Sequence, residues 1–181
     1  DGCTSPVTNI DITVHPIPDV SNLPMAGEIC SEATHAVTLT SNVTPGTTFA
    51  WTFTDNPDVT GEAGGNGTAF SQTLTNTGID IEQVTFQITP TSAFGCEGDP
   101  QDYTITVNPT PHLDITPLTH NQCDGANTNI TLSSLVSGTL FTWSFTDNPN
   151  VTGETSSAAP GTLINDLLDN TSWTNQTVTY T

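Results

Sequence analysis

The residues best suited to chemistry lie in an oxygen-rich loop that occurs twice in the chain. The loop reads Asp-Asn-Pro-Asp/Asn-Val-Thr-Gly-Glu and occupies residues 55–62 and 147–154. Ca²⁺ binds about six to eight oxygen atoms, which carboxylates, amide carbonyls and backbone carbonyls supply. The loop therefore predicts a Ca²⁺ site, with the candidate ligands Asp55, Asn56, Asp58, Glu62, Asp147, Asn148, Asn150 and Glu154.

A structural interpretation of the same loop is the main alternative. Asp and Asn before Pro form turns in which the side chain accepts hydrogen bonds from its own backbone. The oxygen spacing is not that of an EF-hand loop, and Asn150 in the second copy replaces the carboxylate of Asp58. The sequence favours the capped turn and keeps a bound Ca²⁺ as the second interpretation.

Catalytic chemistry requires acids, bases or nucleophiles that this chain does not repeat. Each of its four histidines aligns with a different residue type in the other copy, so we expect exposed, neutral side chains at His15, His35, His112 and His120. The chain has no Lys or Arg, which excludes Schiff-base chemistry and lysine-dependent phosphate loops. No Gly-x-Ser-x-Gly motif occurs. The sequence predicts no enzymatic activity.

The charge of the chain excludes two classes of partner. The chain has 19 Asp and Glu residues and no Lys or Arg to balance them, so its formal net charge is -19. Nucleic acids and anionic lipids bind through cationic side chains, which are absent here. No apolar run approaches the roughly 18 residues of a membrane span. We therefore expect neither nucleic-acid binding nor membrane insertion, and we expect cations to relieve the self-repulsion of the chain.

The two loops belong to a longer internal repeat of about 93 residues. Residues 49–62 return at 141–154 with an offset of 92, and residues 12–14 return at 105–107 with an offset of 93. Aligning the copies divides the chain into three parts. These are the last strand of a preceding or adjacent-copy repeat at 1–14, a complete repeat at 15–107, and a repeat lacking its last strand at 108–181.

Apolar and polar residues alternate within each repeat, which is typical of strands with one buried face. Turn clusters rich in Gly, Pro and Asn separate these strands, and no segment has a helical period. Thr accounts for 37 residues, and its branched Cβ favours strands. About seven strands per repeat, with Trp on the third, predict an all-β fold of tandem immunoglobulin-like sandwiches.

The aromatic residues of the third strand have two interpretations. Alternation places three of them on one face of a central strand, where burial stabilises by about 1.5–3 kcal/mol per side chain. The same stripe would suit sugar stacking in a carbohydrate-binding module. The sequence favours a core position, and Trp173 is expected to be exposed in a loop. The predicted core residues are Phe49, Trp51, Phe53, Phe141, Trp143 and Phe145.

The motifs, taken in order along the chain, resemble those of a known family. They are Pro-x-Pro at 16–18, Ile-Cys-Ser at 29–31, Phe-x-Trp-x-Phe at 49–53, Thr-Leu-Thr-Asn-Thr at 73–77, Val-Thr-Phe-x-Ile-Thr-Pro at 84–90, Gly-Cys-x-Gly at 95–98 and Ile-Thr-Val-x-Pro at 105–109. This order resembles the PKD-like repeats of giant Bacteroidetes surface proteins, which include gliding-motility adhesins. The family's Cys-Ser-Gly is altered to Cys-Ser-Glu at 30–32 and to Cys-Asp-Gly at 123–125. The resemblance implies a secreted, repetitive, non-catalytic stalk or adhesin, and it names no ligand.

The cysteines predict an oxidising, extracytoplasmic location, because they form no Cys-x-x-Cys pair. In one scheme Cys30 bonds Cys96 within a unit, while Cys3 and Cys123 find partners outside it. Against this, Cys30 precedes the second strand and Cys96 precedes the last, so their turns lie at opposite ends of such a sandwich. In the other scheme a disulfide joins the first turn of one unit to the last hairpin of the next. Both schemes stay open.

The first segment of the chain has the alternation of a last strand. We expect residues 7–14 to pair with the 108–181 unit of an adjacent copy, as a separate subunit or within a continuous array. The predicted function is an extracellular or cell-surface stalk, filament or adhesin segment assembled head to tail. The alternative is a carbohydrate-binding accessory module of a secreted polysaccharide-degrading enzyme, with a surface glycan as its partner. The predicted assembly residues are Val7, Ile10, Ile12 and Val14.

Overall fold

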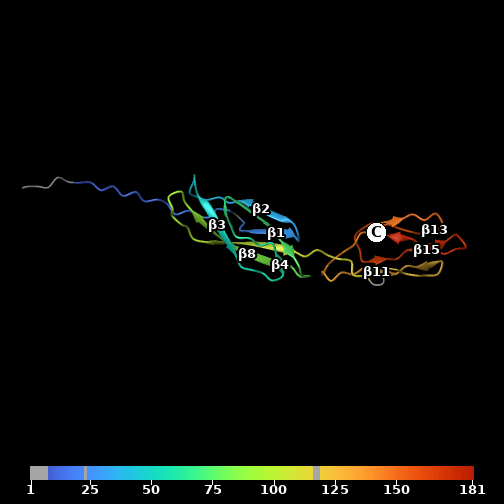
Figure 1. The fold of residues 1–181 in the computed structure, drawn as a ribbon. Coiled ribbons are helices and arrows are strands. Elements are labelled where there is room, and N and C mark those ends of the chain that lie inside the picture. The colour runs from blue at the N-terminus through green and yellow to red at the C-terminus, as the bar shows by residue number, and fades with distance from the viewer. Residues whose placement is uncertain (1–7, 23, 116–118) are drawn as a thin grey trace, which may run out of the picture. The chain divides into compact units, whose positions relative to one another are not determined.

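The computed structural model describes residues 8–22, 24–115 and 119–181, and every regular element within them is a β-strand (Figure 1). The prediction of an all-β fold is therefore confirmed. The chain divides into two compact units, a first unit of 1–77 with 81–108 and a second unit of 78–80 with 109–181. No helix in the described part of the chain is long and apolar enough to cross a membrane.

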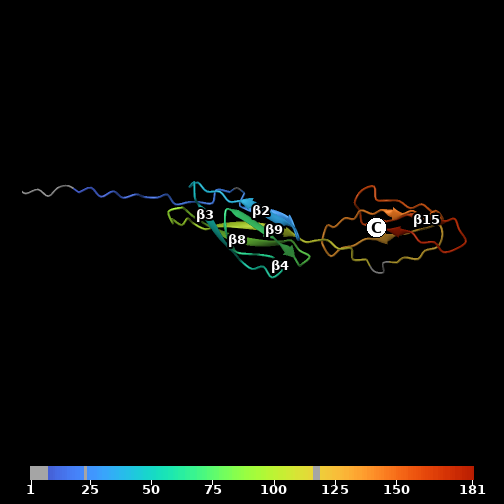
Figure 2. The same ribbon diagram turned by 45° about the horizontal axis from the view of Figure 1, so that its top comes forward.

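The first unit is a sandwich of two layers. Its larger sheet has five strands in the order β1-β9-β8-β3-β5, and the pairs β2-β6 and β4-β7 form the rest. Figures 1 and 2 show β2 and β8 on opposite sides of this unit. The strands are β1 (Ala26–Cys30), β2 (Thr34–Thr38), β3 (Thr48–Phe53), β4 (Val59–Thr60), β5 (Gly65–Gly67), β6 (Ala69–Thr73), β7 (Thr75–Asn76), β8 (Glu82–Thr91) and β9 (Gln101–Asn108).

The last strand of the first unit, β9, lies between two neighbours in the large sheet. It runs parallel to β1 and antiparallel to β8. In this register Ile105 lies opposite Gly27 on β1 and opposite Val84 on β8. Because β9 hydrogen-bonds on both sides, its removal would leave β1 without a sheet partner and β8 with one unpaired edge.

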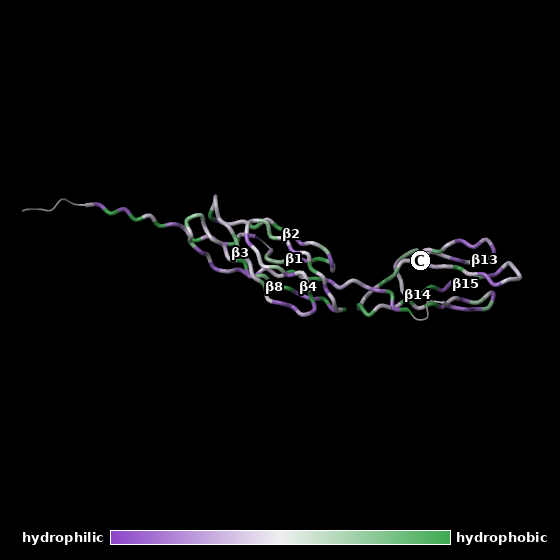
Figure 3. The backbone as a smooth tube through the Cα atoms, in the orientation of Figure 1, coloured by the Kyte–Doolittle hydropathy of each residue, from purple (hydrophilic) through white to green (hydrophobic). Residues whose placement is uncertain are grey.

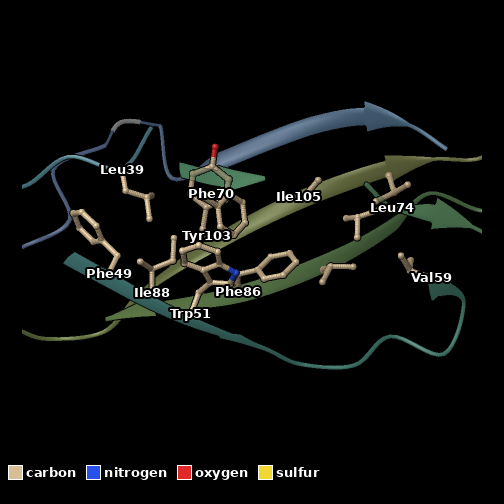
Figure 4. Close-up of a cluster of buried hydrophobic side chains, with 12 residues drawn as sticks. Leu39, Phe49, Trp51, Val59, Phe70, Leu74, Phe86, Ile88, Tyr103 and Ile105 are labelled. Atoms are coloured by element: carbon tan, nitrogen blue, oxygen red, sulfur yellow. The ribbon is translucent and has the colours of Figure 1, made fainter. Parts of the chain in front are cut away.

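The core of the first unit lies between the two layers (Figure 4). The ring of Phe70 on β6 packs edge-on against Phe86 on β8 at a centroid distance of 5.1 Å and against Trp51 on β3 at 5.4 Å. It also lies 5.3 Å from the ring of Tyr103 on β9. The alternation in the sequence forms this core because successive side chains of a strand point to opposite faces. Along β8, for example, the apolar residues Val84, Phe86 and Ile88 are all fully buried.

The second unit has the same plan with shorter strands. Among its described residues the buried apolar side chains are fewer than in the first unit, namely Leu132, Val151 and Ile164. A three-stranded sheet of order β10-β15-β13 accompanies the pairs β11-β14 and β12-β16. The strands are β10 (Ala126–Asn127), β11 (Ile130–Thr131), β12 (Phe145–Thr146), β13 (Val151–Thr152), β14 (Leu163–Ile164), β15 (Leu167–Asn170) and β16 (Thr179–Tyr180).

Among the described residues of 109–181 no strand pairs as β9 does in the first unit, and the strands there are shorter. Residues 119–123 align with β1, yet they form no strand. The segment aligned with β8 keeps only β16, which pairs with β12 on its other side. A strand without a hydrogen-bonded neighbour has unpaired N–H and C=O groups along that edge.

Candidate functional site

The Asp-Asn-Pro loop of the first unit is a turn held by the side chain of Asn56. Its Oδ1 accepts a hydrogen bond from the backbone N–H of Asp58 at 3.0 Å. Its Nδ2 donates to Glu82 Oε2 at 2.9 Å and to the backbone carbonyl of Gln83 at 3.1 Å. The amide therefore uses both its oxygen and its nitrogen to fix the turn and to attach it to the start of β8.

The loop of the second unit repeats these contacts. The backbone N–H of Asn150 donates to Asn148 Oδ1 at 3.0 Å. Asn148 Nδ2 donates to Gln176 Oε1 at 3.3 Å and to the carbonyl of Thr177 at 3.0 Å. Each turn is followed by a two-residue strand, β4 or β13. The capped turn followed by a short strand therefore accounts for the recurrence of this motif.

The predicted Ca²⁺ ligands do not come together as a cluster of acidic groups. Asp55, Asp58 and Asp147 are exposed. Within the described ranges no three His, Cys, Asp or Glu side chains are close enough to hold a metal ion. One carboxylate oxygen in each loop, Oε1 of Glu62 or of Glu154, is buried without a hydrogen-bond partner. One such oxygen per unit falls short of the ligand set of Ca²⁺.

A buried polar cluster in the second unit was not predicted from the sequence. Asp166 accepts hydrogen bonds from the N–H of Thr155 at 2.8 Å and from its Oγ1 at 2.5 Å. It also accepts one from the hydroxyl of Tyr180 at 2.5 Å. Burial raises the pKa of Tyr180, and the nearby Asp166 and Glu154 carboxylates raise it further. In the first unit Gln72 makes the equivalent tie by bonding the backbone of Ala63.

The expectation that all four histidines are exposed is wrong for His35. This residue is half-buried, and its Nε2 lies 2.8 Å from the hydroxyl of Tyr103, which also donates to the carbonyl of Ala26 at 3.2 Å. Burial lowers the pKa of His35. The ring of His15 is also partly covered, because it stacks on Phe94 at 3.7 Å. These contacts join residues distant in sequence, so local pattern gave no signal for them.

The predicted core aromatics of the first unit divide into two groups. Phe49 and Trp51 are buried, and Trp51 Nε1 donates to the carbonyl of Ala63 at 3.2 Å. The prediction is wrong for Phe53, which is 36% exposed. The reason is that β5 pairs only with residues 49–51 of β3, so this flank of the strand has no partner at Phe53.

The corresponding aromatics of the second unit are only half-buried. Phe141, Trp143 and Phe145 each keep part of their surface in solvent, although Trp143 Nε1 still donates to the carbonyl of Thr155 at 3.2 Å. Two counterparts of β8 residues are also less buried. Val178 and Tyr180 are half-exposed, whereas the matching Val84 and Phe86 of the first unit are fully buried. Among the described residues, the second unit therefore buries these side chains less completely than the first unit does.

The described cysteines, Cys30, Cys96 and Cys123, are free thiols, and Cys3 lies outside the described residues. The scheme with a disulfide inside one unit is wrong for the first unit. Cys30 lies opposite Asn108 at the end of β9, whereas Cys96 precedes the start of that strand. Because the eight residues of β9 span about 23 Å at about 3.3 Å per step, the two thiols cannot meet.

Residues 8–14, which we name the N-terminal arm, form no strand in the structure. Three apolar residues of the arm alternate with polar ones, and Figure 3 shows hydrophobic and hydrophilic colours alternating along this part of the tube. Their exposed fractions are 84% for Ile10, 83% for Ile12 and 86% for Val14. The fourth predicted assembly residue, Val7, lies outside the described residues. The arm therefore presents an apolar stripe with the period of a strand and no cover.

The fold and these sites define a tandem β-sandwich of the immunoglobulin-like class. The chain belongs to the PKD-like domain family, whose sequence model matches residues 27–111 and 114–181. The resemblance to PKD-like repeats is thus confirmed. No curated protein matches the chain.

Two solved structures show similarity to the chain at low identity. One is the Bacteroides ovatus mixed-linkage glucan utilization locus protein SGBP-B, solved with a mixed-linkage heptasaccharide, at 14% identity and a TM-score of 0.33; the match covers 92% of this chain and 43% of that protein. The other is a Porphyromonas gingivalis W83 protein of unknown function, at 13% identity and a TM-score of 0.33, with 86% and 84% of the two chains covered.

Proposed function

We propose that this chain is a structural segment of an extracellular or cell-surface stalk, filament or adhesin, assembled head to tail and without catalytic activity. The observation that carries this proposal is how its recurring residues are used. Asn56 and Asn148 hold turns, and Trp51 and Trp143 donate to backbone carbonyls of their own units. A repeated chemical function would instead repeat a reactive or ligand-binding group at the surface.

The charge of the chain also supports an extended extracellular assembly. A formal net charge of -19 disfavours aggregation of separate molecules through mutual repulsion, and it disfavours binding to nucleic acid or to anionic membranes. The membership of the PKD-like family agrees with an extracellular or cell-surface location.

Microscopy of the native material tests this proposal. Negative-stain images of protein released from the native cell surface are expected to show elongated particles with repeating globular units. Mass spectrometry of the reduced, denatured protein then separates a continuous array from subunits near 19.0 kDa. Compact, monomeric particles with no repeating unit would contradict the stalk or filament function.

Carbohydrate binding is the second candidate, and one observation favours it. Trp173 is fully exposed, and an exposed Trp ring is the type of surface on which sugar rings stack. Its counterpart in the first unit is Ile79, so the two units do not share an aromatic platform. A glycan array with the wild-type chain and Trp173→Ala distinguishes the candidates, because a binding module would lose its signal in the variant.

A further inference from the structure

We propose that the paired strands β1 and β9 form a mechanical clamp, which carries tension on the chain through the first unit. This inference rests on the proposed function and deepens it, because a stalk or an adhesin transmits the pull of whatever it holds. The chain enters β1 at Ala26 and leaves β9 at Asn108. Tension on the chain at either side of this pair therefore acts on the outer ends of the two strands.

The parallel pairing of β1 with β9 places the clamp under shear. Ala26 lies opposite Thr104, and Cys30 lies opposite Asn108. The two points of load, Ala26 and Asn108, are thus separated by about 13 Å along the strands and by only about 5 Å across them. A pull on these points draws the strands past each other in opposite directions, so the bonds of the ladder are loaded together. Strands that are loaded at one shared end would instead separate bond by bond.

The ladder between the two strands continues past both ends of β1. The N–H of Thr104 donates to the carbonyl of Met25 at 3.2 Å, and the N–H of Ser31 donates to the carbonyl of Asn108 at 2.8 Å. The side-chain amide of Asn108 adds a bond across the pair, to Glu28 Oε1 at 2.9 Å. Because the bonds of a parallel ladder are evenly spaced, the load is shared along the whole length of β1.

Side-chain hydrogen bonds reinforce the clamp at its two loaded ends. At the start of β1, the hydroxyl of the buried Tyr103 donates to the carbonyl of Ala26 at 3.2 Å. At the end of β9, the amide of Asn76 donates to the carbonyl of Val107 at 2.9 Å. These bonds hold the positions at which each strand would have to move first.

The ring of His35 on β2 covers the start of the clamp. Its Nε2 lies 2.8 Å from the Tyr103 hydroxyl. Because that hydroxyl donates to Ala26, it accepts its second hydrogen bond from the Nε2–H of the neutral imidazole. A Cβ at Gly27 would overlap the ring of His35, so the ring lies directly against the backbone of β1. Water competes for hydrogen bonds, and this cover keeps it from the loaded end.

The segment that precedes β1 is held to the unit by exposed hydrogen bonds. Asp19 Oδ1 accepts from the N–H of Asn42 at 2.8 Å, and Asn42 Oδ1 accepts from the N–H of Asp19 at 3.1 Å. Asn22 Oδ1 accepts from the N–H of Thr40 at 2.8 Å. Because water competes for exposed bonds, we expect tension to open this segment first and then to act on the clamp.

Two points of attachment on the same 181-residue chain test the clamp. Single-molecule force spectroscopy holds the chain by a C-terminal tag and by either an N-terminal tag or the exposed thiol of Cys30, with the other three cysteines replaced by Ser in both cases. Because Cys30 lies opposite Asn108, a pull from Cys30 peels β1 from β9. The rupture force of the first unit is expected to be at least about twofold lower from Cys30, since the evenly spaced bonds then break in turn.

The second unit is the internal reference in this experiment. It is stretched between the same two points in both cases, so its rupture force should not change. Opening of the clamp releases the chain from Ala26 to Asn108, whose extended length is about 270–300 Å. Only the step that belongs to the first unit should therefore respond to the point of attachment.

A pair of variants separates a mechanical effect from an effect on equilibrium stability. Tyr103→Phe removes the hydroxyl bond to Ala26, whereas Ile88→Val removes a buried methyl group from β8, which stays paired with β9 while the clamp opens. In urea, each variant is expected to raise the unfolding equilibrium constant by a similar factor, about fivefold. At constant force, Tyr103→Phe should raise the opening rate about fivefold and Ile88→Val less than about twofold.

Two results would overturn the inference. Equal rupture forces from the N-terminus and from Cys30 would show that the ladder between β1 and β9 does not bear the load. An equal rise in opening rate for Tyr103→Phe and Ile88→Val would place the mechanical barrier in the core and not in the clamp. Elongated native particles seen by microscopy would persist in both cases, so failure of the clamp and failure of the proposed function are distinguishable.

Discussion

The difference between the two central tryptophans gives the sharpest test of the packing described above. Trp51 is 7% exposed, packs edge-on against Phe70 and donates its indole N–H to the carbonyl of Ala63. Trp51→Ala empties this site and removes one of the two donors to that carbonyl, which keeps its hydrogen bond from Gln72 Nε2 at 2.9 Å. Large-to-small changes of a buried aromatic cost about 3–5 kcal/mol, and we expect this range for the first unit.

Trp143→Ala is the matched control within the same chain. The side chain makes the equivalent hydrogen bond to Thr155 but is only half-buried. The free energy lost on truncation scales with the apolar area removed from water, so we expect about half the cost of Trp51→Ala.

Differential scanning calorimetry measures both variants. For a domain of about 60–100 residues, each kcal/mol lowers Tm by about 4–8 °C, so Trp51→Ala should lower the Tm of the first unit by at least about 12 °C. Trp51 is the sole tryptophan of the first unit, and its loss from the fluorescence spectrum assigns that transition. Equal Tm losses for the two variants would refute the inference that Trp143 contributes less to its core than Trp51 does.

Three further outcomes are expected. Gly65→Ala should lower the Tm of the first unit, because the new Cβ would lie 2.6 Å from the buried ring of Trp51. Gly161→Ala should be tolerated, because its Cβ would lie at an ordinary 3.8 Å from the ring of Trp143. Equal Tm losses for the two variants would contradict the tight packing at Gly65. Burial lowers the pKa of His35 in the folded chain below its unfolded value, so the free energy of unfolding should be full above about pH 6.5 and should fall as the pH drops through the folded pKa. Urea unfolding at pH 7.5 and at pH 5 measures this loss of stability. His35→Thr should make the loss smaller. Asn56→Ala should lower the free energy of unfolding by about 1–3 kcal/mol because the turn loses its side-chain hydrogen bonds, whereas Asp58→Ala should leave it nearly unchanged. CaCl₂ should raise Tm no more than MgCl₂ does at matched ionic strength. A larger rise with CaCl₂ would instead indicate a specific Ca²⁺ site.

The class of fold, the repeat and the family could all be predicted from the amino-acid sequence. Alternation with a period of two predicts strands because it depends only on neighbouring side chains pointing to opposite faces. The repeat of residues 49–62 at 141–154 is likewise visible without any structure. The burial of Phe49 and Trp51 follows the same local pattern.

Which apolar side chains are buried depends on contacts between segments that are distant in the sequence. Phe53 has the alternation of a core residue, but its burial depends on how far β5 extends along β3. His35 meets Tyr103 across 68 residues of sequence, and the parallel pairing of β1 with β9 sets Cys30 far from Cys96. Such contacts depend on pairings between distant segments, which local alternation does not encode.

The second unit shows the same division most clearly. Its aromatic stripe is nearly identical in sequence to that of the first unit, yet Phe141 and Trp143 are half-exposed, whereas Phe49 and Trp51 are buried. The stripe determines which face of the strand is apolar, and that information is local. Whether the face is sealed depends on a neighbouring strand at the position of β9, because burial is a property of the surrounding elements and not of the segment itself.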